Sequence, residues 1–190
     1  MLPLTLDLCR LSALVVGEGP CAARRLALLL DSGAPRITLF APVPIPAILD
    51  LCARHPQVCL ENRWPDSGDF HPGQIVLVAD IEEPALEQLV MIARTAGTWI
   101  NVEDRIPYCD FHIPSLLRRG DLIFSISTHG KSPTLARRLR ACLERLFPPE
   151  WAERLETLAA LRQQWRHEGL SLTAIAQRSN AWIDRQNWLP

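Results

Sequence analysis

Ala13-Leu-Val-Val-Gly17-Glu-Gly19-Pro20-Cys-Ala22 is the stretch that decides the fold, because an apolar run passes through a glycine turn into a helical pattern. The apolar run predicts a buried strand, and the apolar spacing after the turn predicts an amphipathic helix. Gly17-x-Gly19-x-x-Ala22 is a short dinucleotide-binding fingerprint, whose glycines permit a tight turn and a close approach to a pyrophosphate. Ala22 lets the helix pack closely on the strand, and the helix N-terminus adds the positive end of a dipole. A fingerprint this short predicts a cofactor but no reaction.

Length, charge and composition favour a globular protein of the cytoplasm. The chain has 190 residues, enough for one full domain and an accessory segment, and its formal net charge is -1. A charge this close to neutral argues against nucleic acid as a partner. No stretch approaches the ~20 apolar residues that span a bilayer, and the N-terminus lacks the basic region and cleavage site of a secretory signal. We therefore expect a cytoplasmic protein without a nucleic-acid or membrane partner.

The cysteines are scattered and form no CxxC pair, so the sequence predicts no metal site. Small buried hydrophobic residues in a reducing compartment are the better interpretation of all six cysteines. Two cysteines, Cys21 and Cys109, lie next to candidate site residues, where modification could affect activity without either thiol acting as a nucleophile.

Predicted strands and helices alternate along the first 112 residues. Spacing of this kind implies right-handed crossovers and a parallel sheet, which predicts an α/β, Rossmann-like domain over residues 1–112. The acid that grips the adenosine ribose at the end of the second strand is missing, and Phe40-Ala-Pro42-Val43 stands there instead. The motif therefore leaves NAD and NADP as open alternatives. Strands are expected over 11–16, 36–41, 57–61, 75–79 and 98–102, and helices over 20–32, 45–54 and 83–96.

The pattern changes after residue 112. Residues 121–127 alternate as a strand, and Ser132 with Pro133 at the first helical position predicts a helix that runs to about Leu146. Pro148-Pro149 marks a boundary between a small α+β segment, 113–148, and a helical C-terminal region, 149–190. The tail carries an apolar stripe that favours core packing over a cofactor site. The stripe consists of Trp151, Leu155, Leu158, Leu161 and Trp165.

Three motifs follow the predicted sheet in a fixed order. They are Asn101-Val-Glu-Asp104, Cys109-Asp-Phe-His-Ile-Pro114 and Ser127-Thr-His-Gly-Lys-Ser-Pro133. With the glycine turn, they make the chain resemble the precorrin-2 dehydrogenase/sirohydrochlorin ferrochelatase family, the N-terminal module of many siroheme synthases. The resemblance covers about residues 1–148.

The resemblance implies an activity, a cofactor and an assembly. Members of the family use NAD+ to oxidise precorrin-2 to sirohydrochlorin, and many also insert ferrous iron, a second substrate, to give siroheme. The family further implies a homodimer built through residues 113–148. The key aspartate of the family falls on Asp104. The cofactor contacts implied for this chain are Gly17, Gly19, Pro20, Cys21, Pro42, Val43 and Asn101.

The chemistry of the residues agrees with a catalytic Asp104. It comes just after the carboxyl end of a predicted strand, where open α/β sheets place their ligands. Oxidation of a reduced macrocycle needs hydride transfer and removal of a proton, and a carboxylate can be that base. Metal insertion also removes protons from pyrrole nitrogens, so one carboxylate could serve both steps. The alternative is an ordinary turn aspartate, and spacing alone would favour it.

The tetrapyrrole substrates of the family carry many carboxylates, so their site should present donors and positive charge. The residues expected to bind them are Arg119, Thr128, His129, Lys131, Ser132 and Arg137. A solvated helix face is the better interpretation of Arg138 and Arg140, and Asp110 is as easily a turn residue as a functional one.

Several positions depart from the family pattern. Glu18 replaces a glycine of the turn, Asp80 follows the fourth strand where a threonine is usual, and His129 replaces a glycine. These departures keep open a non-enzymatic tetrapyrrole- or NAD-binding protein for delivery or sensing. An unrelated Rossmann oxidoreductase of small molecules is the third alternative.

Overall fold

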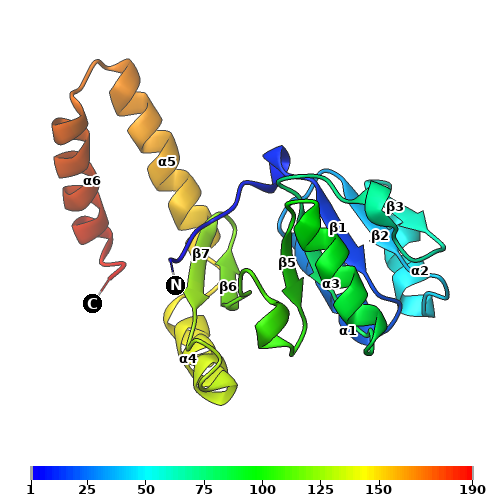
Figure 1. The fold of residues 1–190 in the computed structure, drawn as a ribbon. Helices are drawn as coiled ribbons and strands as arrows, with labels where there is room; N and C mark the ends of the chain where they lie inside the picture. The colour runs from blue at the N-terminus through cyan, green and yellow to red at the C-terminus, as the bar shows by residue number, and fades with distance from the viewer. Residues whose placement is uncertain (1, 190) are drawn as a thin grey trace. The chain divides into compact units, whose positions relative to one another are not determined.

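A computed structural model describes residues 2–189, which divide into two compact units (Figure 1). Unit 1 ends at Ile113 and unit 2 begins at Pro114. Each unit has its own sheet and helices and is described by itself.

Unit 1 is built on a parallel sheet with the strand order β3-β2-β1-β4-β5. Val16, Phe40, Val78 and Val102 lie in register at the ends of four neighbouring strands, so their carboxyl ends form one edge. The strands are β1 (Ala13–Val16), β2 (Ile37–Phe40), β3 (Val58–Glu61), β4 (Ile75–Val78) and β5 (Trp99–Val102). The helices are α1 (Pro20–Asp31), α2 (Pro46–Arg54) and α3 (Ala85–Thr95), with 3-10 turns η1 (Leu8–Arg10), η2 (Ser67–Asp69) and η3 (Ile106–Tyr108).

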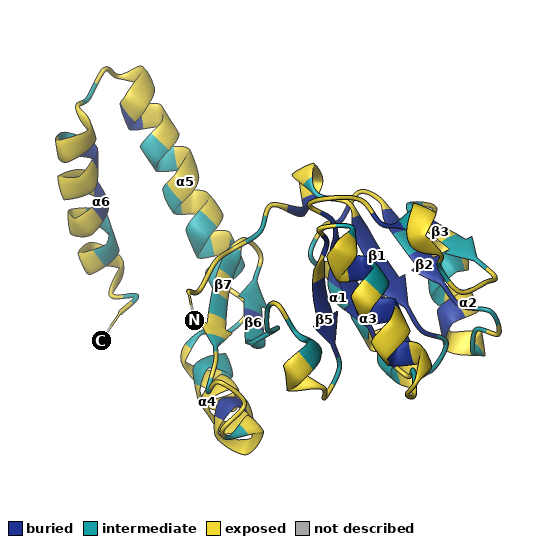
Figure 2. Cartoon of the chain, in the orientation of Figure 1, coloured by how far each residue is buried: buried dark blue, intermediate teal, exposed yellow. Residues whose placement is uncertain are grey.

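Both faces of this sheet are covered, which is why β1 and β4 are apolar throughout and do not alternate. On one face Val15 and Leu77 pack with Leu26 of α1 and Ile48 of α2. On the other face the strands pack against α3 through side chains such as Leu89. Figure 2 shows β1, β2 and β5 as largely buried strands, whereas β3 at the edge of the sheet is only partly buried.

Unit 2 pairs two antiparallel strands and adds three helices. The strands are β6 (Ser115–Arg119) and β7 (Leu122–Ile126), and the helices are α4 (Pro133–Leu146), α5 (Trp151–His167) and α6 (Leu172–Gln186). Ser132 and Ser171 cap α4 and α6 by accepting backbone N–H groups with their hydroxyls. A chain of ring contacts joins Phe124, Phe147 and Trp151 to the C-terminal tryptophans Trp188 and Trp182.

The predicted Rossmann-like sheet and the helical C-terminal region are confirmed, and the element boundaries shift by only a few residues. Sequence reasoning missed β6, and it did not divide the helical tail, which breaks between α5 and α6 at Gly169 (φ 79°). Of the predicted apolar stripe, Trp165 is buried and the other four side chains are half-buried. The boundary predicted at residue 148 lies inside unit 2 and stays a prediction. Within residues 2–189, no helix is both long and apolar enough to cross a bilayer.

Candidate functional site

Three neighbouring strands of unit 1 end in residues with unusual backbone geometry. Gly17 follows β1 with φ 144°, and Asp80 and Asp104 follow β4 and β5, each with φ 58°. Left-handed backbone at a non-glycine residue costs energy and gathers at functional sites. The three residues stand at the carboxyl edge of the sheet, beside the switch point between β1 and β4 where open α/β sheets bind ligands.

Gly17 makes the sharp exit from β1. Its N–H donates to the carbonyl oxygen of Phe40 (3.0 Å), and a Cβ built on it would collide with the carbonyl oxygen of Ala79. The same Cβ would lie 3.0 Å from the Cβ of Ala22. The first glycine and the alanine of the fingerprint therefore have the packing roles that the motif predicts.

The N-terminus of α1 holds an internal carboxylate. The N–H of Ala22 donates to Oδ2 of Asp80 (2.8 Å), and a Cβ on Gly19 would lie 2.7 Å from Cγ of Asp80. The Asp80 carboxylate, with burial and Glu103 as weaker causes, also raises the pKa of the Cys21 thiol, which therefore stays protonated. Sequence reasoning noticed Asp80 only as a departure from a pattern. An acid directly after a buried strand, facing a glycine turn, is the signal that could have identified it.

The segment after β2 presents Pro42 and Val43. Val43 is 75% exposed, and its N–H donates to Oε2 of Glu18 in the glycine turn (3.0 Å). The carbonyl oxygen of Glu18 accepts from the N–H of Ile45 (3.1 Å). The turn after β1 and the segment after β2 are thus held together at the same edge.

Asp104 is exposed, and the structure of residues 2–189 gives its carboxylate no hydrogen bond or ion pair. Its neighbour Glu103 pairs with two arginines: Oε1 accepts from Nη2 of Arg24 (3.2 Å), and Oε2 lies 2.9 Å from Nε of Arg25 without hydrogen-bond geometry. Both arginines belong to α1, so this contact fixes the end of β5 against the helix that follows the fingerprint. The outcome is a free carboxylate on a well-anchored turn.

Asn101 is 5% exposed and holds the segment that folds back after η3. Its Nδ2 donates to the carbonyl oxygen of Phe111 (2.9 Å), while its buried Oδ1 has no partner among the described residues. Asp110 accepts from the N–H of Ile100 (3.0 Å) and pairs with Arg94 (2.9 Å). These contacts give Asp110 a structural role, because they tie the returning segment to β5 and α3.

Four of the six predicted substrate-binding residues, Thr128, His129, Lys131 and Ser132, lie in the turn before α4. Thr128 accepts two backbone bonds. The N–H of Ser132 donates to its Oγ1 (3.2 Å), and the N–H of Lys131 donates to the carbonyl oxygen of Thr128 (3.0 Å). His129 sits between them with φ 54°, which explains the preference for glycine there. Lys131 and His129 are exposed, so the turn presents a cation and an imidazole at a helix N-terminus.

Arg119 and Arg137 are placed differently. Arg119 donates from Nε to the carbonyl oxygen of Phe147 (2.7 Å) and from Nη2 to that of Glu144 (3.5 Å), which are the last carbonyls of α4. These bonds satisfy a helix C-terminus, so the guanidinium has a structural task in this arrangement. Arg137 is exposed on the first turns of α4, where its Nη2 lies 3.5 Å from Oγ1 of Thr134.

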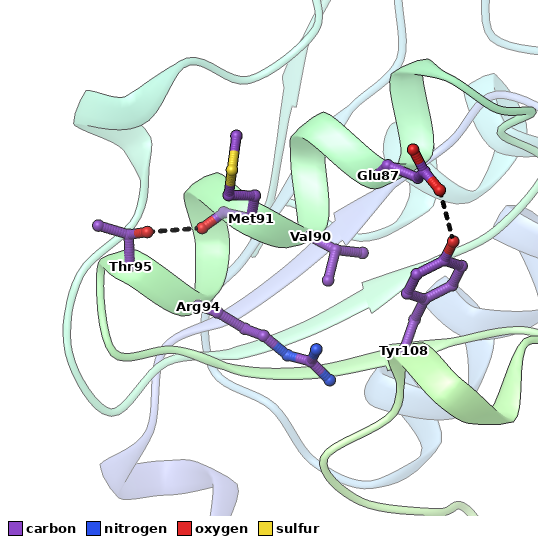
Figure 3. A pocket seen from close by; sticks show the side chains of 6 residues that line it. All are labelled: Glu87, Val90, Met91, Arg94, Thr95 and Tyr108. Carbon is purple, nitrogen blue, oxygen red and sulfur yellow. Dashed lines mark hydrogen bonds between the residues drawn. The ribbon is translucent and has the colours of Figure 1, made fainter.

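A shallow pocket lies beside α3, away from the glycine turn (Figure 3). Tyr108 borders it and shares its hydroxyl with Glu87 and Glu83 (3.2 Å each). Burial and these carboxylates raise the pKa of the Tyr108 hydroxyl. The pocket brings together no group of the candidate site, and among residues 2–189 no three potential metal ligands cluster.

The family described as "Putative NAD(P)-binding" matches residues 4–115, which is more than half of the chain and contains the whole glycine turn and β5 edge. The chain belongs to this family. A second family, described as the central part of a sirohaem biosynthesis protein, matches residues 119–146. The resemblance to the precorrin-2 dehydrogenase/sirohydrochlorin ferrochelatase family is thereby confirmed.

Proteins similar in sequence to this chain include siroheme synthases. One from Nitrosomonas eutropha is 36% identical over 83% of this chain and 33% of its own length. Siroheme synthase 1 of Klebsiella pneumoniae is 33% identical over 95% of this chain and 37% of its own length. The chain thus spans about a third of the length of these relatives. Among solved structures, SirC, a precorrin-2 dehydrogenase, matches with a TM-score of 0.80 and 27% identity over all of this chain and 93% of that one.

Proposed function

We propose that this chain oxidises precorrin-2 to sirohydrochlorin with NAD+ as the acceptor. In this reaction a hydride leaves the macrocycle for the nicotinamide and a proton leaves for a base, giving sirohydrochlorin, NADH and H+. The observation that carries the proposal is the free carboxylate of Asp104 at the end of β5, on the same sheet edge as the glycine turn. The likeness to SirC, a precorrin-2 dehydrogenase, supports it.

The residues of unit 1 fit a dinucleotide at this edge. Gly17 and Gly19 form the turn, Pro42 and Val43 border it on the β2 side, and the buried Oδ1 of Asn101 is an acceptor that lacks a protein partner. In the first turn of α1, Pro20 has no N–H and Ala22 donates to Asp80, so Cys21 supplies the backbone donor. NAD+ bound at this edge of the sheet would act as the hydride acceptor.

Asp104 is assigned the role of proton acceptor. An exposed carboxylate with no hydrogen bond or ion pair among residues 2–189 has lone pairs available for a proton from the macrocycle. The contacts of Glu103 with Arg24 and Arg25 hold the turn that carries it, so the carboxylate keeps its place at the edge. A positioned base of this kind contributes about 100- to 10,000-fold to a rate.

The turn before α4 is assigned to the carboxylates of the tetrapyrrole. Lys131 offers an ammonium group, and Thr128, His129 and Ser132 surround it at the N-terminus of α4, with Arg137 on the same helix. Arg119 would join them only by giving up its bonds to the end of α4. Ferrous iron insertion into sirohydrochlorin is proposed as a second activity, with the same carboxylate accepting the pyrrole protons.

A homodimer is proposed through unit 2. Among the described residues β6 and β7 pair only with each other, so each strand has an unpaired edge at which a second copy could add a strand. Ile123 of β7 and Leu146 of α4 are exposed apolar side chains in this region. The mass of the chain in solution, measured by light scattering, tests whether two copies cover these surfaces.

An anaerobic assay with precorrin-2 and NAD+ tests the proposed oxidation. We expect NADH at 340 nm and the sirohydrochlorin spectrum to appear together in equal amounts. A parallel reaction with ferrous iron tests chelation through the siroheme spectrum. Tight binding of the macrocycle without NADH would instead support a delivery or sensing protein, an alternative favoured by the carboxylate of Asp80 at the N-terminus of α1.

Asp80→Asn is expected to bind NAD+ about five- to tenfold more tightly than the wild-type chain, because a negative charge near the pyrophosphate disappears. Asparagine caps a helix about as well as aspartate, so its amide oxygen can keep the bond from the N–H of Ala22. Calorimetric titration measures the effect, with Glu82→Gln as a control on an exposed neighbour. Weaker binding in Asp80→Asn would show that the carboxylate helps to hold the cofactor.

A further inference from the structure

The adenosine end of the site lacks its usual acid. In dinucleotide-binding sheets, an acid at the end of the second strand accepts the ribose hydroxyls. Here β2 ends at Phe40 and continues into Ala41, Pro42 and Val43, none of which carries a charge. Either the ribose has no charged partner in this protein, or another residue brings a carboxylate to the same place.

Glu18 brings one. It lies in the turn after β1, and its Oε2 accepts the N–H of Val43 (3.0 Å), so its carboxylate stands at the end of β2. Its backbone oxygen accepts from Ile45 (3.1 Å), which fixes the turn against the same segment from the main-chain side. Within residues 2–189 the other carboxylate oxygen, Oε1, has no bond, and Glu18 is only half-buried. A charged acceptor is therefore held in place with one oxygen free.

The cations of this region do not offset that charge. Between residues 37 and 69 the basic side chains are Arg54, His55 and Arg63. Arg54 and His55 precede β3 and so lie toward the opposite edge of the parallel sheet.

Arg63 follows β3 at the carboxyl edge, but other groups already hold it. Its Nη1 and Nη2 donate to the two oxygens of Asp69 (2.7 Å each), and the guanidinium lies over the ring of Phe40 (5.0 Å to its centroid). This bidentate pairing lowers the pKa of the Asp69 carboxyl, so Asp69 stays charged at neutral pH. Glu61 adds a third charge 3.6 Å from Arg63. The edge at β2 is left acidic, with its arginine neutralised.

We infer that Glu18 replaces the missing acid of the second strand: it binds the adenosine ribose hydroxyls and makes the site select NAD+ over NADP+. A carboxylate can accept both ribose hydroxyls, whereas a 2′-phosphate would bring negative charge against it with no free arginine to compensate. The inference rests on the proposed dinucleotide site and deepens it. It assigns the selectivity of that site to one residue of the glycine turn.

Titrations of the full chain with NAD+ and with NADP+ test this role. The variants are Glu18→Gln, which removes the charge while keeping an acceptor for Val43, and Glu18→Ala, which removes both. Asp31→Asn is the matched control, because it removes an equal charge from the far end of α1. Circular dichroism melts show whether each variant keeps its fold.

The wild-type chain is expected to bind NAD+ at least about tenfold more tightly than NADP+. In Glu18→Gln the ratio of the two dissociation constants should fall about tenfold. Glu18→Ala should narrow the ratio as well and weaken NAD+ binding, while Asp31→Asn should change neither. A wild-type chain that binds both cofactors equally, or a ratio unchanged in both Glu18 variants, overturns the inference and leaves the dinucleotide site intact. If the wild-type chain binds neither cofactor, the proposed function fails with it.

Discussion

Asp104→Asn is expected to bind NAD+ with an unchanged dissociation constant and to oxidise precorrin-2 at least about 100-fold more slowly than the wild-type chain. The amide has nearly the shape of the carboxylate but cannot accept the proton that leaves the macrocycle. Because the exposed Asp104 side chain makes no hydrogen bond or ion pair among residues 2–189, its replacement should leave the fold unchanged. Single-turnover formation of NADH, measured anaerobically, separates the chemical step from binding.

Two further variants serve as controls for the expected loss of rate in Asp104→Asn. Asp104→Glu restores a carboxylate one methylene further from the backbone and should recover part of the rate. Asp50→Asn removes an exposed charge from α2 and should leave the rate unchanged. If Asp104→Asn turned over at the wild-type rate, another group would be the base, and the proposed role of this residue would be wrong.

The strands and helices of unit 1 could be predicted from the sequence because each depends on a local pattern of residues. The strands β1 and β4 are short, wholly apolar runs, and α1, α2 and α3 pack apolar side chains against the sheet. The strand β6 was missed for the opposite reason. Ser115-Leu-Leu-Arg-Arg119 has no alternation, and its strand character comes from pairing with β7 across the turn at Gly120.

The site could be predicted only in part, because its decisive contacts join residues far apart in the chain. The fingerprint predicted Gly17 and the family resemblance predicted Asp104, and both lie at the carboxyl ends of strands. It could not show that Asp80 reaches the N–H of Ala22, 58 residues away. It likewise gave no sign that Glu18 reaches Val43, since that contact depends on how the turn and the segment after β2 pack.

The role of the motif around Cys109 also depends on contacts that the sequence does not show. Its residues accompany Asp104 in the family pattern, and the sequence left open whether Asp110 is a turn residue or a functional one. In the structure, the Cys109 sulfur accepts the N–H of Val102 (3.3 Å) and Asp110 binds Ile100 and Arg94, so the segment braces β5. The motif therefore serves the candidate site by supporting the strand that carries Asp104.

Gly17→Ala is expected to destabilise unit 1 by about 3 kcal/mol, from left-handed strain and from overpacking against a fixed backbone. At φ 144° a side chain is strained in any surroundings, and here the new Cβ also collides with the carbonyl oxygen of Ala79. Neither β1 nor β4 can retreat, because both are buried and hydrogen-bonded on both sides. Hydrogen exchange of the β1 amides measures the loss, because it reports on unit 1 directly.

Gly33→Ala is the matched control for this loss. Gly33 also has a positive φ, 74°, but a Cβ there meets nothing within 4 Å. Its substitution should therefore cost only the left-handed penalty, about 1 kcal/mol. Equal losses in the two variants would mean that the contact with Ala79 relaxes freely. A larger loss at Gly17, accompanied by lost NAD+ binding, would tie the cofactor site to the close approach of β1 and β4 at their carboxyl ends.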